Sequence, residues 1–467
     1  MCGVIGIFGR ISLKDIVTPL QLLTHRGQDA TGLAWASSDG IKTQKCFGYV
    51  DNLKIDEHET TDVCIGATRY PTAGASVLHI EKFSQPYTAQ TPYGMLCLTH
   101  NGNIANMMQI AERLGMQEFG NDTELIAHLL ADLLSKNKGD MAESVSQMML
   151  MLDGSYSITC IFNDKLVVFR DPKGIRPLFL AKTNTHVMTA SETVCFQLEN
   201  PEYIRDVEPG ELIIIGKDGM VSKKLRTEKN YHCMFEYVYF SHPTSTVDGR
   251  NVYDVRIRLG EKLAKQIMRK GIKADMVACV PETSRPAAQK MAEMLGLPFR
   301  DILIRNWHVD RTFIMKDQKT REVYASRKYL VNDYFLKGRK VLIVDDSIVR
   351  GTTSKKIIEL LRNHGAEEVH LAITCPPIIS PCYYGIDFAT YKELAAHGKS
   401  VEAIREMINA DSLTYQTIDD LKEAIGLPDL CTACLTKEYP TPYGAVLNRL
   451  AEDGRLSDEG RHYQHTD

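Results

Sequence analysis

The second residue of the chain is a cysteine whose position can bring two reactive groups together. Removal of Met1 would leave the thiol of Cys2 and a free α-amine on one residue, and such an amine has a reference pKa of about 7.7–8. A base of that strength beside a thiol nucleophile suits covalent acyl transfer. Taken alone, Cys2 could also be an ordinary residue at the start of a buried strand.

The sequence THNGN, residues 99–103, supplies hydrogen-bond donors after an apolar run. A thiolate that attacks a carboxamide needs donors for the tetrahedral oxyanion, and the Asn101 side chain and the Gly102 backbone N–H are groups of that kind. Asn-Gly is also a common hairpin turn, so this motif alone leaves both interpretations open.

Three charged residues could bind the backbone groups of an amino-acid substrate. Arg26 lies in THRGQDATG, Arg69 in GATRYPTAG and Asp122 in NDTE. An α-carboxylate requires a cation and an α-ammonium requires an anion. Each arginine, considered singly, could instead form a surface ion pair.

The stretch KVLIVDDSIVRGTTS, residues 340–354, combines carboxylates with a loop that could bind phosphate. A buried strand would deliver Asp345 and Asp346 to its carboxyl end, where open α/β sheets bind ligands. The small and hydroxyl-bearing residues 350–354 then open a helix, and a helix N-terminus favours phosphate. The two carboxylates suit ribose hydroxyls or Mg²⁺. Acidic residues at a strand end would explain the Asp pair but not the adjoining loop.

Two different patterns of elements must position these groups. The first half reads as short β-type runs separated by turns, with a helix from Glu124 that the cluster Asn121–Thr123 would cap. After about Lys229 helices and strands alternate, which predicts a parallel sheet with crossover helices. We therefore expect an α/β protein with domains at 2–230 and 231–467. Beyond about Gly385 the sequence predicts a mostly polar helical tail without a core of its own.

Length and composition fit a two-domain enzyme that acts on small molecules. The chain has 467 residues, 44% hydrophobic and 24% charged, with a net charge of −4, so no basic field favours nucleic acid or a membrane surface. It has neither a long apolar stretch nor a secretory signal, which predicts a cytoplasmic location without membrane contact. The twelve cysteines are then better read as reduced thiols, metal ligands or catalytic groups than as disulfides.

Five motifs of the first half resemble, in order, those of the N-terminal-nucleophile glutamine amidotransferase domain: MCGVIGIFG, THRGQDATG, GATRYPTAG, THNGN and NDTELIAHLL. The resemblance implies a four-layer αββα sandwich with antiparallel sheets. Cys2 would be the nucleophile with its own α-amine as base, and Asn101 and Gly102 the oxyanion hole. It also implies a glutamine site whose residues are Arg69 and Asp122, with Arg26 in support.

The motif VDDSIVRGTT resembles the signature of type I phosphoribosyltransferases, whose ligand is 5-phosphoribosyl-1-pyrophosphate (PRPP). By this resemblance Asp345 and Asp346 contact ribose and Mg²⁺, and Thr283 of PETS is a further ligand on the magnesium side. Arg311 of RTFIM would belong to a flexible loop that closes over the pyrophosphate. The residues implied at the 5-phosphate are Ser347, Gly351, Thr352, Thr353 and Ser354.

With CVPETS, DPKGIRPL and ASET, the resemblance covers about residues 2 to 440 and extends to the family of glutamine PRPP amidotransferases. These enzymes convert glutamine, PRPP and water to 5-phosphoribosylamine, glutamate and pyrophosphate, the first committed step of purine synthesis, and pass ammonia between their domains. Members are dimers or tetramers that purine nucleotides inhibit. The resemblance implies the same substrates, homo-oligomer and inhibitors here.

The remaining cysteines include a CTAC motif at Cys431 and Cys434. This spacing alone could be a chance occurrence, a zinc site or a redox dithiol. One branch of the resembled family holds a [4Fe-4S] cluster, with ligands in segments that resemble YHCMFEYVYF, SPCYYGID and CTACLTKEYP. The implied ligands are Cys233, Cys382, Cys431 and Cys434. Such a cluster would attach the tail to the body of the protein, while zinc or free thiols remain alternatives.

The sequence departs from the family in two places. Cluster-bearing relatives commonly carry a propeptide, whereas maturation here is expected to need only removal of Met1. In residues 305–311 the family's usual KNRYVGR is altered at Trp307 and Asp310, which affects how the loop would close. Two rival functions are a phosphoribosyltransferase-like nucleotide sensor without turnover and the hexosamine-forming synthase. The second would need a sugar-isomerase half in place of VDDSIVRGTT.

Overall fold

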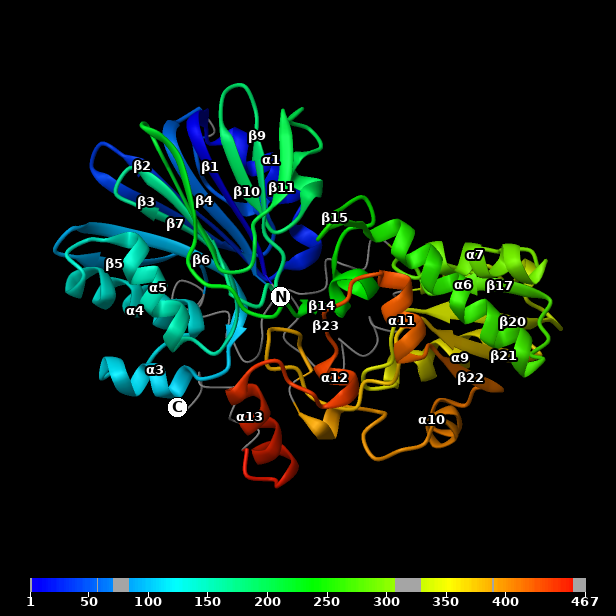
Figure 1. Ribbon diagram of the computed structural model, residues 1–467. Helices are drawn as coiled ribbons and strands as arrows, with labels where there is room; N and C mark the ends of the chain where they lie inside the picture. Colours follow the sequence, from blue (N-terminus) through cyan, green and yellow to red (C-terminus); the bar gives the residue numbers. More distant parts are fainter. Residues whose placement is uncertain (1, 57, 70–83, 307–328, 389, 457–467) are drawn as a thin grey trace.

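The structure is a computed structural model that describes residues 2–56, 58–69, 84–306, 329–388 and 390–456. The chain forms a β-rich unit and an α/β unit that lie side by side (Figure 1). None of the helices in the described ranges is long and apolar enough to cross a membrane.

The β-rich unit contains two antiparallel sheets. The seven-stranded sheet has the order β11-β9-β10-β1-β4-β2-β3, and the six-stranded sheet has the order β13-β12-β8-β7-β6-β5. The strands of the first sheet are β1 (Gly3–Ser12), β2 (Ala30–Ser37), β3 (Gly40–Phe47), β4 (Thr60–Arg69), β9 (Phe179–Lys182), β10 (Val187–Ala190) and β11 (Tyr203–Asp206). The strands of the second are β5 (Tyr87–Thr91), β6 (Gly94–Ile104), β7 (Gly154–Phe162), β8 (Lys165–Arg170), β12 (Glu211–Gly216) and β13 (Gly219–Lys224).

Helices cover the outer faces of both sheets. Fully buried apolar residues such as Val4, Ile65 and Val168 fill the space between the sheets. A second apolar core joins the six-stranded sheet to α3 (Met107–Leu114), α4 (Asp122–Lys136) and α5 (Met141–Met151), and α1 (Lys14–Gln21) packs on β1 and β4. This arrangement confirms the expected αββα sandwich.

The α/β unit is built on a parallel sheet of order β17-β20-β21-β22, as expected from the alternating pattern. Its strands are β17 (Met276–Cys279), β20 (Lys340–Asp345), β21 (Glu368–Ile373) and β22 (Ser412–Tyr415). The helices around it are α6 (Val252–Lys270), α7 (Arg285–Leu295), α9 (Thr352–Asn363), α10 (Val401–Ile408) and α11 (Ile418–Ile425). The carboxyl end of β20 therefore presents Asp345.

The C-terminal region differs from the expected polar helical tail, because β22 adds the fourth strand to the parallel sheet. Leu413 and Tyr415 of this strand are buried. A strand of four residues between polar helices is too short for its periodicity to reveal it. The chain then returns to the junction of the two units, where β23 (Leu430–Cys431) pairs with β14 (His232–Cys233), as Figure 1 shows.

Shorter elements complete the described chain. The strands β18 (Leu303–Arg305) and β19 (Tyr329–Val331) pair with each other, as do β15 (Thr246–Val247) and β16 (Arg250–Asn251). The short helices are η1 (Thr24–Arg26), η2 (Val50–Asn52), η4 (Thr193–Phe196), the π-helix η5 (Glu236–Phe240), η7 (Asp333–Phe335), η8 (Tyr391–Glu393) and α12 (Ala433–Thr436). The helix α13 (Pro442–Glu452) follows them.

Candidate functional site

Cys2 lies directly before β1, which sits between β10 and β4 in the seven-stranded sheet. Val4 and Ile5 are fully buried, so the start of the strand is anchored in the core. The thiol itself is partly exposed. Because Gly3 pairs with Thr68, Cys2 lies beside the carboxyl end of β4.

Gln85 connects the Cys2 thiol to the strand that carries the oxyanion donors. Its Nε2 lies 3.8 Å from Cys2 Sγ and donates to the His100 backbone oxygen at 2.9 Å. Its Oε1 accepts from the His100 N–H at 2.6 Å. The nucleophile beside one sheet and strand β6 of the other sheet therefore meet at Gln85. Asn101 and Gly102 lie inside β6, opposite Ser157 and Tyr156, so the hairpin turn that Asn-Gly could indicate is not formed here.

Asn101 and Gly102 lie next to that bridge on β6. Asn101 is fully buried, and its Oδ1 has no hydrogen-bond partner among the described residues. Its Nδ2 is 3.5 Å from Ser191 Oγ, which also accepts from the Val4 N–H. Gly102 has φ +153°, and a Cβ there would lie 2.0 Å from the Ser155 backbone oxygen. Both predicted oxyanion donors thus occupy fixed positions, and the one at Gly102 excludes any larger residue.

Arg69 and Asp122 supply opposite charges close to the same strand. Arg69 ends β4, and its Nη1 is buried without a hydrogen-bond partner in the described part of the chain. Asp122 begins α4, whose N-cap Asn121 accepts from the Glu124 N–H. Burial alone would raise the pKa of Asp122, but His100 at 3.5 Å and Arg69 together hold it below its usual value. A cation and an anion so placed suit the backbone groups of an amino acid.

Arg26 lies beneath Cys2 as part of a fully buried charge network. Its Nε donates to the Cys2 backbone oxygen at 3.2 Å. Its Nη2 and Nη1 donate to the two carboxylate oxygens of Glu236 at 2.8 and 2.9 Å. It also pairs with Glu192. Burial opposes the charge of Arg26, but Glu236 and Glu192 outweigh burial and raise its pKa. The contacts of Arg26 support the backbone of the nucleophile.

The carboxylates of the α/β unit lie where β20 ends. Asp345 and Asp346 are 7% and 8% exposed. Asp345 Oδ1 accepts from the Asp346 N–H at 2.9 Å, and Asp346 accepts from the hydroxyls of Ser347, at 2.7 Å, and of Thr283. The structure therefore brings together all four of these predicted residues.

The predicted phosphate loop leads directly into α9. Gly351, with φ +81°, is the N-cap residue, and Thr352 and Thr353 are exposed in the first turn. Ser354 is buried. The backbone N–H groups of such a turn suit a phosphate. Arg311, like Trp307 and Asp310, lies outside the described residues.

The oxygen donors at Asp345, Asp346 and Thr283 fit Mg²⁺. In the described ranges, no group of three or more His, Cys, Asp or Glu side chains is arranged to hold a metal ion. Magnesium is usually bound by one or two carboxylates together with water and substrate phosphate. Two buried neighbouring carboxylates satisfy that requirement.

The four predicted cluster cysteines come together at the junction of the two units. Cys233 of β14 is directly opposite Cys431 of β23, and Cys434 follows in α12. The Cys434 backbone oxygen accepts from the N–H groups of Ile379 and Ser380, close to Cys382. The four residues are 8–9% exposed, and all twelve cysteines of the chain are free thiols.

The thiols also affect one another electrostatically. Burial raises the pKa of Cys434, and Cys382, Cys375 and Cys431 raise it further. A [4Fe-4S] cluster takes four thiolates, one from each of four cysteines, and these four buried thiols fit it.

Four buried residues around Cys2 carry no predicted role: Gln85, Arg176, Glu192 and Glu236. Arg176 and Glu192 lie in the motifs DPKGIRPL and ASET, so those motifs were the available signal. Gln85 has no such signal, because its partners are distant in sequence. Glu236 lies in the quoted segment YHCMFEYVYF, for which only the cysteine was given a role.

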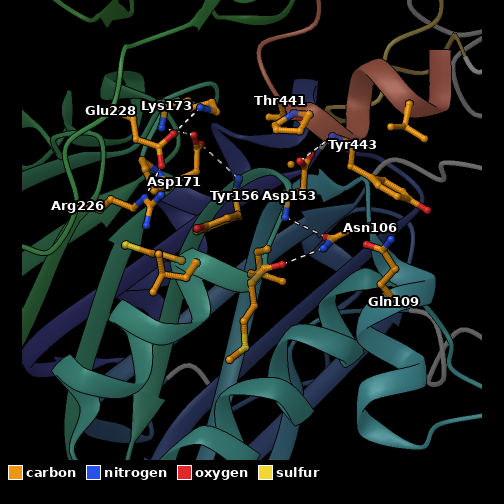
Figure 2. A pocket seen from close by; sticks show the side chains of 18 residues that line it. Asn106, Gln109, Asp153, Tyr156, Asp171, Lys173, Arg226, Glu228, Thr441 and Tyr443 are labelled. Carbon is orange, nitrogen blue, oxygen red and sulfur yellow. Dashed lines mark hydrogen bonds and ion pairs between the residues drawn. The ribbon is translucent and has the colours of Figure 1, made fainter. Parts of the chain in front are cut away.

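A cavity of about 460 Å³ lies apart from both predicted sites, between α13 and the β-rich unit (Figure 2). None of the predicted site residues lines it. Asp153 Oδ2 accepts from the Tyr443 N–H at 2.9 Å, which docks the start of α13 on the sandwich. The cavity therefore marks a packing boundary between α13 and the sandwich.

Comparisons with known proteins agree with the two halves. The model of the phosphoribosyl transferase domain matches residues 250–382, and that of the glutamine amidotransferase domain matches residues 73–197. The chain is 41% identical to the amidophosphoribosyltransferase of Methanothermobacter thermautotrophicus and 37% identical to that of Bacillus subtilis, over 94% of both chains in each case.

A solved structure gives the same result at the level of the fold. The glutamine PRPP amidotransferase from Bacillus subtilis, complexed with ADP and GMP, superposes with a TM-score of 0.84 at 36% identity. The match covers 95% of this chain and 98% of that one. Both units therefore occur together, in the same relative order, in a protein of known structure.

Proposed function

Because the chain belongs to the amidophosphoribosyltransferase family and catalyses glutamine-dependent amidotransfer to PRPP in purine biosynthesis, we propose that Cys2 attacks glutamine and that Asp345 and Asp346 bind PRPP. One observation carries the first assignment. Gln85 contacts both Cys2 Sγ and the backbone of His100, directly before the oxyanion donors.

In the glutaminase reaction the Cys2 thiol attacks the side-chain amide carbon of glutamine, and the α-amine of Cys2 takes the thiol proton. The Asn101 Nδ2 and the Gly102 N–H stabilise the oxyanion that forms. Collapse of the tetrahedral intermediate releases ammonia and leaves a thioester, which water hydrolyses to glutamate. Arg69 binds the substrate carboxylate and Asp122 its ammonium group.

In the synthase reaction Asp345 and Asp346 bind the ribose of PRPP. Ser347 and the turn 351–354 bind the 5-phosphate at the start of α9, and Arg311 is the predicted pyrophosphate contact. Mg²⁺, held by Asp345, Asp346 and Thr283, would neutralise the charge of the pyrophosphate leaving group. Ammonia then forms a bond to C1 of ribose while the bond from C1 to pyrophosphate breaks.

We also propose that ammonia passes between the two domains without release to solvent. Free ammonia is mostly protonated at neutral pH and is then no nucleophile. Both sites border the same junction, since Glu236 of η5 pairs with Arg26 beneath Cys2 while the neighbouring carbonyls contact Arg256. Release toward this junction would keep ammonia unprotonated until it meets PRPP.

A [4Fe-4S] cluster bound by Cys233, Cys382, Cys431 and Cys434 is part of the proposal, with a structural role. The four thiols come from three separate segments of the chain. Bound iron would therefore join β14, the 382–385 turn and the C-terminal region.

The proposed regulation, oligomeric state and cellular location of the protein are those expected for its family. The Bacillus subtilis relative was solved with ADP and GMP, which supports purine nucleotides as inhibitors here. We propose a homodimer or homotetramer in the cytoplasm. The twelve free thiols are compatible with a reducing compartment.

The proposal is tested by the products released at steady state from glutamine and PRPP. We expect equal amounts of glutamate and pyrophosphate, both dependent on PRPP and Mg²⁺. A protein that binds PRPP but releases neither product would be a nucleotide sensor, which would overturn the proposal.

A further inference from the structure

We propose that Arg176 is a positioning residue of the glutaminase site, acting on both the nucleophile and the oxyanion hole. The inference rests on the proposed role of Cys2 in glutamine hydrolysis. Arg176 lies on the loop after β8, and its side chain is fully buried. In the described part of the chain its side chain donates to Tyr384 and Glu236 and not to Cys2 or Asn101, so its influence passes through other groups.

The guanidinium of Arg176 joins two segments that are distant in sequence. Its Nε donates to the Tyr384 backbone oxygen at 2.8 Å, and its Nη2 donates to the same oxygen. Its Nη1 donates to Glu236 Oε1 at 3.3 Å. One planar cation therefore fixes a carbonyl of the turn 382–385 relative to a carboxylate of η5.

The carboxylate side of this link leads to the nucleophile. Glu236 accepts hydrogen bonds from both Nη atoms of Arg26, and Arg26 Nε donates to the Cys2 backbone oxygen. Glu236 and Arg26 are at most 1% exposed. Loss of one charge would leave another buried and uncompensated, so the remaining groups would have to move.

The carbonyl side leads to the part of β6 that carries the oxyanion donors. The Tyr384 oxygen also accepts from Ser155 Oγ at 2.9 Å, and the Tyr383 oxygen accepts from Asn103 Nδ2 at 2.9 Å. A Cβ on Gly385 would lie 3.1 Å from the Gly102 backbone oxygen. A shift of the turn 382–385 would therefore displace Gly102, whose N–H is a proposed oxyanion donor.

The same turn carries one of the proposed cluster ligands. The Tyr384 N–H is directed at Cys382 Sγ, at 3.4 Å. Arg176 fixes Tyr384 through its oxygen, and a ligand on Cys382 would fix the turn from its other end. Arg176 and Cys382 should then both fix the position of this turn and, through it, the position of Cys2. Iron content and the reactivity of the Cys2 thiol can report this effect separately from turnover.

The expected effect follows from the geometric demands of the chemistry. Small misplacements caused by distant substitutions can reduce rates by about 100-fold. We expect Arg176→Met to lower kcat for glutamine by about 100-fold while KM for PRPP stays unchanged. Synthesis from added ammonia should stay within about twofold of wild type, because Arg176 forms no hydrogen bond with the proposed PRPP residues that the structure describes. Arg176→Lys keeps the charge and should recover part of the loss.

The experiment compares these variants with Arg205→Met, which breaks another arginine–carboxylate pair of the same unit. Arg205 donates to Glu211 and to the Asp206 backbone oxygen, neither of which is a proposed site residue. Three quantities are measured on anaerobically purified protein: kcat with glutamine and with ammonia, iron per chain, and the rate at which iodoacetamide modifies Cys2, read by mass spectrometry of the N-terminal peptide. We expect Arg176→Met to change the Cys2 modification rate and Arg205→Met to leave it unchanged.

Wild-type glutamine turnover in Arg176→Met would overturn the inference, as would equal losses with glutamine and ammonia. If Arg176→Met does not fold, Glu236→Gln serves instead, since it keeps the shape of the link and removes its charge. A normal ratio of glutamine to ammonia activity in that variant would also overturn the inference. Cys2→Ala is assayed in parallel. If Cys2→Ala kept glutamine turnover, the proposed function itself would fail, whatever Arg176 does.

Discussion

At the scale of single residues, the glutaminase site depends on where each group stands in the chain more than on its type. Most of the other cysteines are buried inside sheets or at the junction, whereas Cys2 is partly exposed at a strand start. Burial raises the pKa of thiols such as Cys97, to about 12. A thiol held protonated in this way is a poor nucleophile.

Gly102→Ala should displace the Gly102 N–H from the oxyanion hole. Its Cβ would lie 2.0 Å from the Ser155 oxygen, and its φ of +153° is unfavourable for alanine. We expect kcat with glutamine to fall by about 100-fold to 1000-fold, as for loss of one oxyanion donor. Ammonia-dependent synthesis should persist. The measurement is kcat with each nitrogen source.

The control for that substitution is Gly115→Ala. Gly115 also has a positive φ, +67°, but an added Cβ meets no atom within 4 Å. Backbone strain alone would then lower stability in both variants. Equal loss of glutamine activity in the two would contradict the role given to Gly102.

Sequence reasoning proposed site residues that stand inside contiguous motifs, such as Cys2, Asn101 and Asp345. It proposed no role for Gln85, nor for Glu236 within YHCMFEYVYF, because the contacts of both residues form only across the fold. Gln85 meets Cys2 only once the two sheets are packed, and Glu236 meets Arg26 across 210 positions of the chain.

At the scale of elements, the π-helix η5 borders both sites. The side chain of Glu236 faces Arg26, while the carbonyls of Tyr237 and Tyr239 accept from Arg256. Burial lowers the pKa of Arg256 to about 10, even though Asp346 and Glu192 raise it. Such helices are rare and frequently occur at functional sites. A single short element thus connects the surroundings of Cys2 with those of PRPP.

The turn between β15 and β16 gives a prediction about pH. Asp248 in this turn accepts from Arg170 and lies 2.8 Å from His232. Burial would raise its pKa, but Arg170 and His232 lower it to about 2. Because the folded-state pKa lies below the unfolded one, this carboxylate stabilises the fold above about pH 4, and that stabilisation is lost as pH falls toward 2.

Asp248→Asn should therefore lower the free energy of unfolding by about 2 kcal/mol at pH 7. Asparagine tolerates the positive φ of 45° found there. The difference between wild type and variant, measured by urea unfolding, should be smaller at pH 3 than at pH 7. A difference that does not change with pH would refute this account of Asp248.

Long elements with clear periodicity, such as β20 and α9, were predictable from sequence. The strand β22 was not, because its four residues are stabilised by pairing with β21, about forty positions earlier in the chain.

At the scale of the whole molecule, the cysteine group lies between the two active sites. The Cys375 N–H donates to the Asp346 backbone oxygen at 2.9 Å, and Cys375 lies close to Cys434. On the other side the turn after Cys382 packs on Gly102. The organisation into two units was evident from the change of rhythm in the sequence, and the resemblance implied that cysteines attach the tail at their junction. The contact of the turn after Cys382 with Gly102 was not predicted, since no local pattern encodes contacts between units.

Anaerobically purified protein should be brown and contain about four irons per chain. Cys431→Ser should lower the iron content, because Cys431 faces Cys233 across the β14–β23 pair. Cys46→Ser is the matched control, since Cys46 lies on β3 away from the junction. Metal analysis decides the point. Stoichiometric zinc without iron in the wild-type protein would exclude the cluster.

The central claim is that one chain holds two separate active sites linked by ammonia. It is tested most directly by Cys2→Ala, assayed for pyrophosphate release from PRPP with glutamine and with ammonium at saturating concentrations. We predict that the glutamine-dependent rate disappears and that the ammonia-dependent rate stays close to wild type. Equal loss of both rates, or retention of the glutamine-dependent rate, would contradict the claim.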